Sequence, residues 1–140
     1  GPAQQQFYQS GELLHRLAAE AGAAVRPTGA GATYTYYCRE GDYIGIHLDI
    51  HTCDLVAITC LSDNSPADAG NAGKLCFWPG AMGQPLSAVR ARPAEGAVVR
   101  RLRPGETLVM LGGLLPHALL PVRAGQLRII SVMCFEVNAA

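Results

Sequence analysis

The sequence predicts a mainly β domain, a sandwich or barrel of short strands preceded by one α-helix. About seven or eight short segments rich in β-branched, aromatic and aliphatic residues follow one another, with turn residues roughly every ten positions. Strands and helices do not alternate, and no Gly-rich phosphate loop is present, which excludes a Rossmann-type fold. At 140 residues the chain, 1–140, is predicted to form a single domain with one hydrophobic core.

Residues 10–22 are predicted to form the helix. Ser10 is a suitable N-cap, Glu12 favours the first turn, and Gly22 is a typical C-terminal stop. Residues 1–2, Gly-Pro, are interpreted as the remnant of a cleaved tag and are left out of the fold prediction. Apolar side chains recur at helical spacing at Leu13, Leu14, Leu17, Ala18 and Ala21. We expect this amphipathic helix to lie against the outside of a sheet.

The β core is predicted over residues 33–137. Residues 23–32 are rich in Gly, Ala and Pro and are interpreted as a linker. Residues 33–38 and 43–49 are predicted to pair as a hairpin around a turn. The remaining strands are predicted at 55–61, 74–78, 97–102, 107–111 and 127–137. Residues 62–73 are predicted to form a polar loop, and the stretch 81–96 is too poorly patterned to predict a structure.

Composition narrows the class of partner. Hydrophobic residues make up 49% of the chain and charged residues 16%, which excludes disorder. No apolar run approaches the roughly 20 residues that span a bilayer. Eleven basic residues balance eleven acidic ones, so there is no basis for binding nucleic acid or an anionic membrane. The composition favours a small-molecule or protein partner, of which a small-molecule substrate is the one predicted, and the oligomeric state is left open.

The cysteines predict a reducing compartment. They are odd in number and lack a Cys-x-x-Cys pair, which favours reduced, buried thiols of a cytoplasmic protein over a disulfide framework or a cysteine zinc site. The five positions are Cys38, Cys53, Cys60, Cys76 and Cys134.

The segment 43–51 carries the candidate metal ligands. Apolar and polar side chains alternate along it, so in a strand His47 and Asp49 point the same way. One further histidine would complete the two-His-one-carboxylate set that binds non-haem Fe(II). His117, which stands between two apolar segments, is the favoured third ligand, and His51 is the other candidate.

Four motifs give the chain a resemblance to the 2-oxoglutarate-dependent Fe(II) oxygenases, in their prolyl-hydroxylase-like branch. The resemblance covers roughly residues 34–137. The motifs are Tyr37 followed by Gly41-Asp42 and His47-x-Asp49, the strand 72–79, the turn and strand 103–111, and His117 followed by Arg128.

The resemblance implies a fold, a site and a reaction. The fold is a double-stranded β-helix of the jelly-roll or cupin type. His47, Asp49 and His117 would be the catalytic Fe(II) ligands, and Arg128 and Tyr37 would bind the 2-oxoglutarate cosubstrate. The enzyme would use O2 to hydroxylate a C–H bond of a small molecule, such as an amino acid or biosynthetic intermediate, and would release succinate and CO2.

Several alternatives stay open at this stage. The substrate can instead be a prolyl-type residue of a protein. A cupin-like metal enzyme would use His47, His51 and His117 without 2-oxoglutarate, and a degenerate member of the fold would only bind a ligand. Arg128 can form an inter-strand salt bridge, with Glu136 or Glu106. Tyr37 can simply pack in a barrel.

Overall fold

The computed structural model describes residues 1–138, and of residues 30 and 31 the backbone only. Its helices are α1 (Pro2–Tyr8), α2 (Gly11–Ala21), the 3-10 turn η1 (Pro79–Ala81) and α3 (Leu86–Ala91). Its strands are β1 (Ala24–Tyr37), β2 (Ile44–His47), β3 (Leu55–Asp63), β4 (Leu75–Phe77), β5 (Val98–Arg100), β6 (Thr107–Met110), β7 (His117–Leu119) and β8 (Arg128–Asn138).

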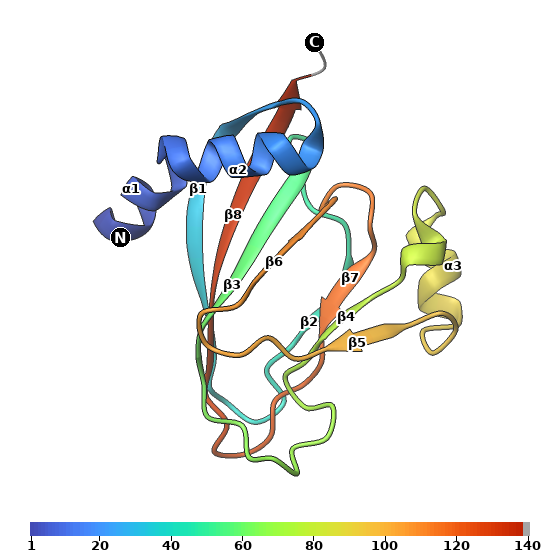
Figure 1. Cartoon of the computed structure of the whole chain (residues 1–140). Coiled ribbons are helices and arrows are strands. Elements are labelled where there is room, and N and C mark those ends of the chain that lie inside the picture. Colours follow the sequence, from blue (N-terminus) through green and yellow to red (C-terminus); the bar gives the residue numbers. More distant parts are fainter. Residues whose placement is uncertain (139–140) are drawn as a thin grey trace.

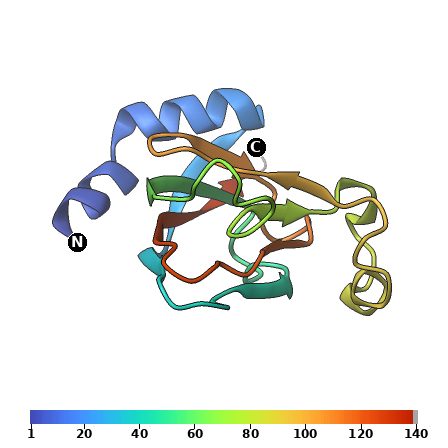
Figure 2. The ribbon, with the colours of Figure 1, turned by 90° about the horizontal axis from the view of Figure 1, so that it is seen from below.

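The strands form two four-stranded antiparallel sheets that face each other (Figures 1 and 2). Sheet A has the order β1-β8-β3-β6, and sheet B has the order β2-β7-β4-β5. Apart from β4 and β5, each strand is followed by one in the opposite sheet, which is the connectivity of a jelly roll. The predicted mainly β sandwich is therefore confirmed. No helix in the described part of the chain has the length and apolarity needed to cross a membrane.

The predicted hairpin and linker are both wrong. β1 pairs with β8 and β2 pairs with β7, so the two segments lie in different sheets, each at an edge. The segment 23–32 is mostly strand, because β8 offers backbone partners along nearly the whole of β1, with a register shift between Pro27 and Ala32. Pro27 lies next to this register shift on an edge strand, the two places in a sheet where proline is usually found.

The N-terminal end contains two helices rather than one. The predicted helix is α2: the Ser10 hydroxyl accepts the Leu13 N–H at 3.3 Å, and Gly22 ends the helix at φ 65°. The sequence pattern missed α1, whose Tyr8 is buried against Phe135 of β8 with the rings 5.0 Å apart. Gly1 is the N-cap of α1; the tag origin of residues 1–2 stays a prediction. Both helices cross the outer face of sheet A (Figure 1).

The hydrophobic core lies between the two sheets and positions the site described below. Inward residues of β3, β4, β7 and β8 fill it, among them Val56, Ile58, Leu75, Leu119 and Ile130. A short helix, α3, forms within the segment for which no structure was predicted. Its Val89 packs against Cys76 and Ala118 on the outer face of sheet B.

A disulfide between Cys53 and Cys134 corrects the prediction of five reduced thiols. The spacing could not indicate this pair, because the two cysteines are 81 residues apart and meet only when β8 passes the end of the loop before β3. Cys38, Cys60 and Cys76 are free. Burial raises the pKa of the Cys60 and Cys76 thiols, which keeps them protonated.

Removing the disulfide is expected to lower the free energy of unfolding by about 2–4 kcal/mol, because the bridge closes a long loop in the unfolded chain. The variant is Cys53→Ala/Cys134→Ala, compared with Cys38→Ala, which removes an exposed free thiol. Urea unfolding followed by circular dichroism measures the change. A double variant as stable as the Cys38→Ala control would show that the bridge does not stabilise the fold.

Candidate metal centre

His47 and His117 face each other across neighbouring strands of sheet B. They are partners in the register of β2 and β7, and their ring centroids are 4.2 Å apart. His117 is buried and His47 is half-buried. The short ladder between the edge strand β2 and its neighbour β7 thus holds two imidazoles side by side at the inner face of the sheet.

Both rings are oriented in the same way by the backbone. Nδ1 of His47 lies 2.8 Å from the Gly45 carbonyl oxygen, and Nδ1 of His117 lies 2.9 Å from that of Leu115. A carbonyl oxygen can only accept, so each Nδ1 carries the proton and each Nε2 keeps a free lone pair. This is the arrangement that prepares histidine to bind a metal through Nε2.

Asp49 follows the end of β2 and turns its carboxylate toward these nitrogens. Its N–H donates to the Gly112 carbonyl at 2.9 Å. Its Oδ1 lies 3.8 Å from Nε2 of His47 and 3.7 Å from Nε2 of His117. The three ligand atoms all fall within 4.8 Å of one another. The structure therefore brings the predicted trio together, although Asp49, predicted to lie in the same strand as His47, lies just beyond the end of β2.

Burial favours the neutral form of His47. Desolvation lowers the pKa of its imidazole below the usual range, and the neighbouring His117 acts in the same direction. The ring is therefore uncharged at neutral pH, and a neutral imidazole is the form that binds metal.

A cavity of about 180 Å³ lies between the sheets at these three residues. Apart from them its wall is made of apolar side chains and of the hydroxyl residues Thr33, Thr35 and Tyr37. Its exposed members, Thr33 and Ile44, belong to the edge strands β1 and β2, so the cavity opens between those two edges.

Arg128 is fully buried at the start of β8. Its Nη1 donates to Asp63 Oδ2 at 2.7 Å and to the Leu102 carbonyl at 3.2 Å. Neither acid proposed from the sequence is its partner: Glu136 accepts from Arg26, and Glu106 accepts the Arg103 N–H. Nε and Nη2 of Arg128 have no partner among the described residues. Together they form one complete edge of the guanidinium, the edge that binds a carboxylate with two parallel hydrogen bonds.

Tyr37 is the residue opposite Arg128 in the register of β1 and β8, and it lines the cavity. Burial raises the pKa of its phenol, so the hydroxyl stays protonated and able to donate. The position fits the predicted role beside Arg128, and its burial in the core also fits the packing alternative.

Asp63, which the sequence indicates only as a solvated loop carboxylate or a binder of a basic substrate, is the partner of Arg128. At the end of β3 its Oδ2 is shared by Arg128 and by Arg101, whose Nη1 lies 3.0 Å away. Arg101 also donates to the Ala72 carbonyl at 2.7 Å and so fixes the loop that follows β3. Burial alone would raise the pKa of Asp63, but hydrogen bonds from Ser65 and the two guanidinium groups outweigh it and lower the pKa. The carboxylate is therefore ionised.

His51 is not part of the cluster. It is exposed and lines a separate groove beside Asp54, Leu111 and Leu114. The structure thus does not assemble the trio of His47, His51 and His117 that the cupin-like alternative requires. Asp54 accepts the Val137 N–H at 2.8 Å and has a structural role.

Comparison with known proteins supports the fold. No protein-family model matches the sequence, and no curated protein matches it. Solved structures share its fold, and three of them serve as examples. SnoN, a non-heme alpha ketoglutarate dependent epimerase from nogalamycin biosynthesis, aligns over 98% of this chain with a TM-score of 0.75 and 16% identity. HygX from Streptomyces hygroscopicus with iron bound aligns over 99% with a TM-score of 0.71 and 15% identity. A Pseudomonas putida prolyl-4-hydroxylase aligns over 94% with a TM-score of 0.58 and 21% identity.

The fold implied by the sequence motifs, that of the 2-oxoglutarate and Fe(II) oxygenases, is thereby confirmed. At these identities the likeness concerns the fold alone. The aligned region covers 57% of the length of the SnoN chain, 65% of that of the prolyl-4-hydroxylase and 69% of that of HygX.

Proposed function

We propose that this chain is an Fe(II) and 2-oxoglutarate-dependent oxygenase domain, with His47, Asp49 and His117 as the iron ligands. The observation that carries the proposal is the convergence of two Nε2 lone pairs and one carboxylate oxygen at the wall of the cavity between the sheets. Two imidazoles and one carboxylate on one side of the ion leave its other coordination positions free for a cosubstrate and dioxygen. The iron bound in HygX and the cosubstrate named for SnoN agree with this assignment.

The residues around Arg128 fit a dicarboxylate cosubstrate. A buried guanidinium edge without an acceptor is costly, and the distal carboxylate of 2-oxoglutarate would supply the two oxygens it lacks. Asp63 occupies only Nη1 and so leaves this edge available. Tyr37, which is in register with Arg128, would donate a further hydrogen bond to the same carboxylate.

When bound, iron and 2-oxoglutarate supply an oxidant derived from O2, with succinate and CO2 as by-products. The protein residues hold and orient these groups. The backbone carbonyls of Gly45 and Leu115 keep both Nε2 atoms deprotonated and directed at the ion. The apolar wall of the cavity excludes water from the reacting atoms.

Hydroxylation of a small molecule is the specific reaction we propose. The cavity is smaller than the roughly 300 Å³ at which drug-sized ligand pockets begin, so it has room for the cosubstrate while the substrate lies at the mouth between β1 and β2. Apart from the metal ligands, the described lining carries no charged side chain. This favours a substrate whose part next to the iron is uncharged.

Turnover of 2-oxoglutarate tests the proposal without knowledge of the substrate. Protein, Fe(II), ascorbate and 2-oxoglutarate are incubated in air, and succinate is measured by mass spectrometry. We expect succinate formation that a chelator stops and that His51→Ala leaves unchanged. No succinate above the level of a protein-free Fe(II) control would contradict the proposed function.

A further inference from the structure

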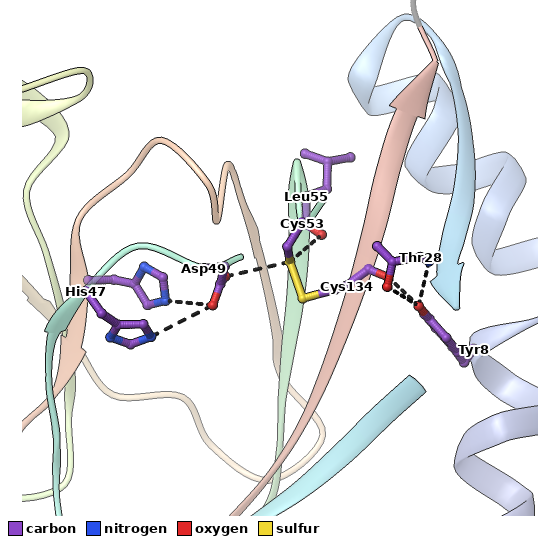
Figure 3. Close-up of a disulfide and its surroundings, with 8 residues drawn as sticks. Tyr8, Thr28, His47, Asp49, Cys53, Leu55 and Cys134 are labelled. Atoms are coloured by element: carbon purple, nitrogen blue, oxygen red, sulfur yellow. Dashed lines mark hydrogen bonds and ion pairs between the residues drawn. A yellow bond between two sulfur atoms is a disulfide. The ribbon is translucent and has the colours of Figure 1, made fainter. Parts of the chain in front are cut away.

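The two oxygens of the Asp49 carboxylate have different surroundings. Oδ1 faces the two histidines. Oδ2 is directed away from them, 3.8 Å from Cys53 Sγ and against the backbone of Gly112. Figure 3 shows the carboxylate between the His47 ring and the disulfide. In this pose only one oxygen is offered to a metal.

The space that Oδ2 occupies exists because residue 112 has no side chain. A Cβ built on Gly112 would lie 2.1 Å from Asp49 Oδ2, too close for both atoms to keep their places, and 3.1 Å from Asp49 Cγ, which is a tight contact. The backbone of Gly112 does not have a positive φ, so an alanine would be allowed by its conformation. The demand for glycine therefore comes mainly from the carboxylate, with a second tight contact to Val56 Cγ1 at 3.0 Å, and not from the backbone conformation.

The backbone around this space is held on several sides. The Asp49 N–H donates to the Gly112 carbonyl, and the Gly113 N–H donates to the Cys53 carbonyl at 2.9 Å. The disulfide ties Cys53 to β8. Because neither backbone segment is free to retreat, an added methyl group would be accommodated by rotation of the Asp49 side chain.

We propose that Gly112 is a positioning residue that acts through Asp49. Its missing side chain lets the carboxylate adopt the rotamer in which Oδ1 alone faces His47 and His117. This inference rests on the proposed function, because it assumes that the three residues bind the metal. Nothing in the sequence pattern singles out Gly112 from its neighbour Gly113.

Cobalt(II) binding to Gly112→Ala tests the inference, with the metal alone as the probe. We expect the dissociation constant to rise about 10- to 100-fold, the range seen when a residue that orients a metal ligand is replaced. Gly80→Ala, at a glycine with nothing within 4 Å of the built Cβ, is the matched control and should bind like wild type. The visible spectrum of bound cobalt, which reports the ligand set, should change in Gly112→Ala only.

A double-mutant cycle with Asp49→Ala separates this role from general damage to the fold. In the Asp49→Ala background the clash with the carboxylate is gone, so Gly112→Ala should cause no further loss of cobalt affinity and no loss of stability. If the single variant does not fold, the double variant should still unfold at the same temperature as Asp49→Ala. A double variant that is weaker or less stable than Asp49→Ala would overturn the inference, since Val56, 3.0 Å from the built Cβ, would then be the cause.

The outcomes also distinguish the two proposals. Wild-type protein that binds cobalt independently of His117 would contradict the proposed function and this inference together. Wild-type binding that His117→Ala weakens and Gly112→Ala does not would overturn the inference alone.

Discussion

Replacing His117 by alanine is expected to lower the affinity for Fe(II) at least about 100-fold and to abolish oxygen-dependent consumption of 2-oxoglutarate. The change removes one of two converging Nε2 lone pairs, which is more severe than the 10- to 100-fold loss typical of residues that only orient a ligand. Because the His117 side chain donates only to the Leu115 carbonyl, the truncated variant leaves just one buried backbone acceptor without its partner.

Anaerobic calorimetric titration with Fe(II) measures the affinity, and succinate formation measures the activity. His15→Ala on the exposed surface of α2 is the control and should match wild type. Retention of wild-type iron affinity in His117→Ala would show that the histidine pair is a structural contact rather than a metal site.

Replacing Asp63 by asparagine is expected to lower the free energy of unfolding by about 3–5 kcal/mol, because it leaves the charge of Arg128 buried without its partner. It also replaces the charged carboxylate that aligns Arg128 and Arg101 by an amide with only one acceptor oxygen, so 2-oxoglutarate should bind more weakly as well. Asp68→Asn, an exposed acid of the following loop, is the matched control.

The pH dependence of stability gives a second measure of the Asp63 effect. Its pKa is lower in the folded than in the unfolded protein, so the ionised group contributes stability that is fully present above about pH 4 and is lost as the pH falls further. Urea unfolding between pH 3 and 7 should therefore show a shallower acid decline in Asp63→Asn than in wild type. Parallel curves for the two proteins would mean that Asp63 does not stabilise the fold through its charge.

The candidate site was predictable where residue types that bind metal stand at a short, regular spacing in the sequence. His47 and Asp49 stand two positions apart, so any extended backbone directs them alike, and His117 stood out because the chain has four histidines in all. Asp63 and Gly112 gave no such signal. Their roles depend on which strands become neighbours, and that pairing joins residues far apart in the chain, such as Asp63 with Arg128.

The dependence on distant strand pairing also explains the errors in the fold prediction. The strands rich in aliphatic residues, such as 55–61 and 127–137, were recognised from their composition alone. The Gly- and Pro-containing half of β1 was not, because its strand conformation is imposed by β8. The Cys53–Cys134 bond and the anchoring of α1 through Tyr8 likewise arise from contacts with β8. These features belong to the tertiary structure and leave no local pattern.

The most direct test of the iron and 2-oxoglutarate assignment is the visible charge-transfer band of the chelated keto acid. Fe(II) is added anaerobically to the protein, and the band is followed while 2-oxoglutarate is titrated. We expect the band in wild type, and in Arg128→Lys a requirement for about 10- to 100-fold more 2-oxoglutarate, because lysine keeps the charge but lacks the two-donor edge. Wild-type protein that binds Fe(II) but shows no band at any concentration of 2-oxoglutarate would contradict the assignment.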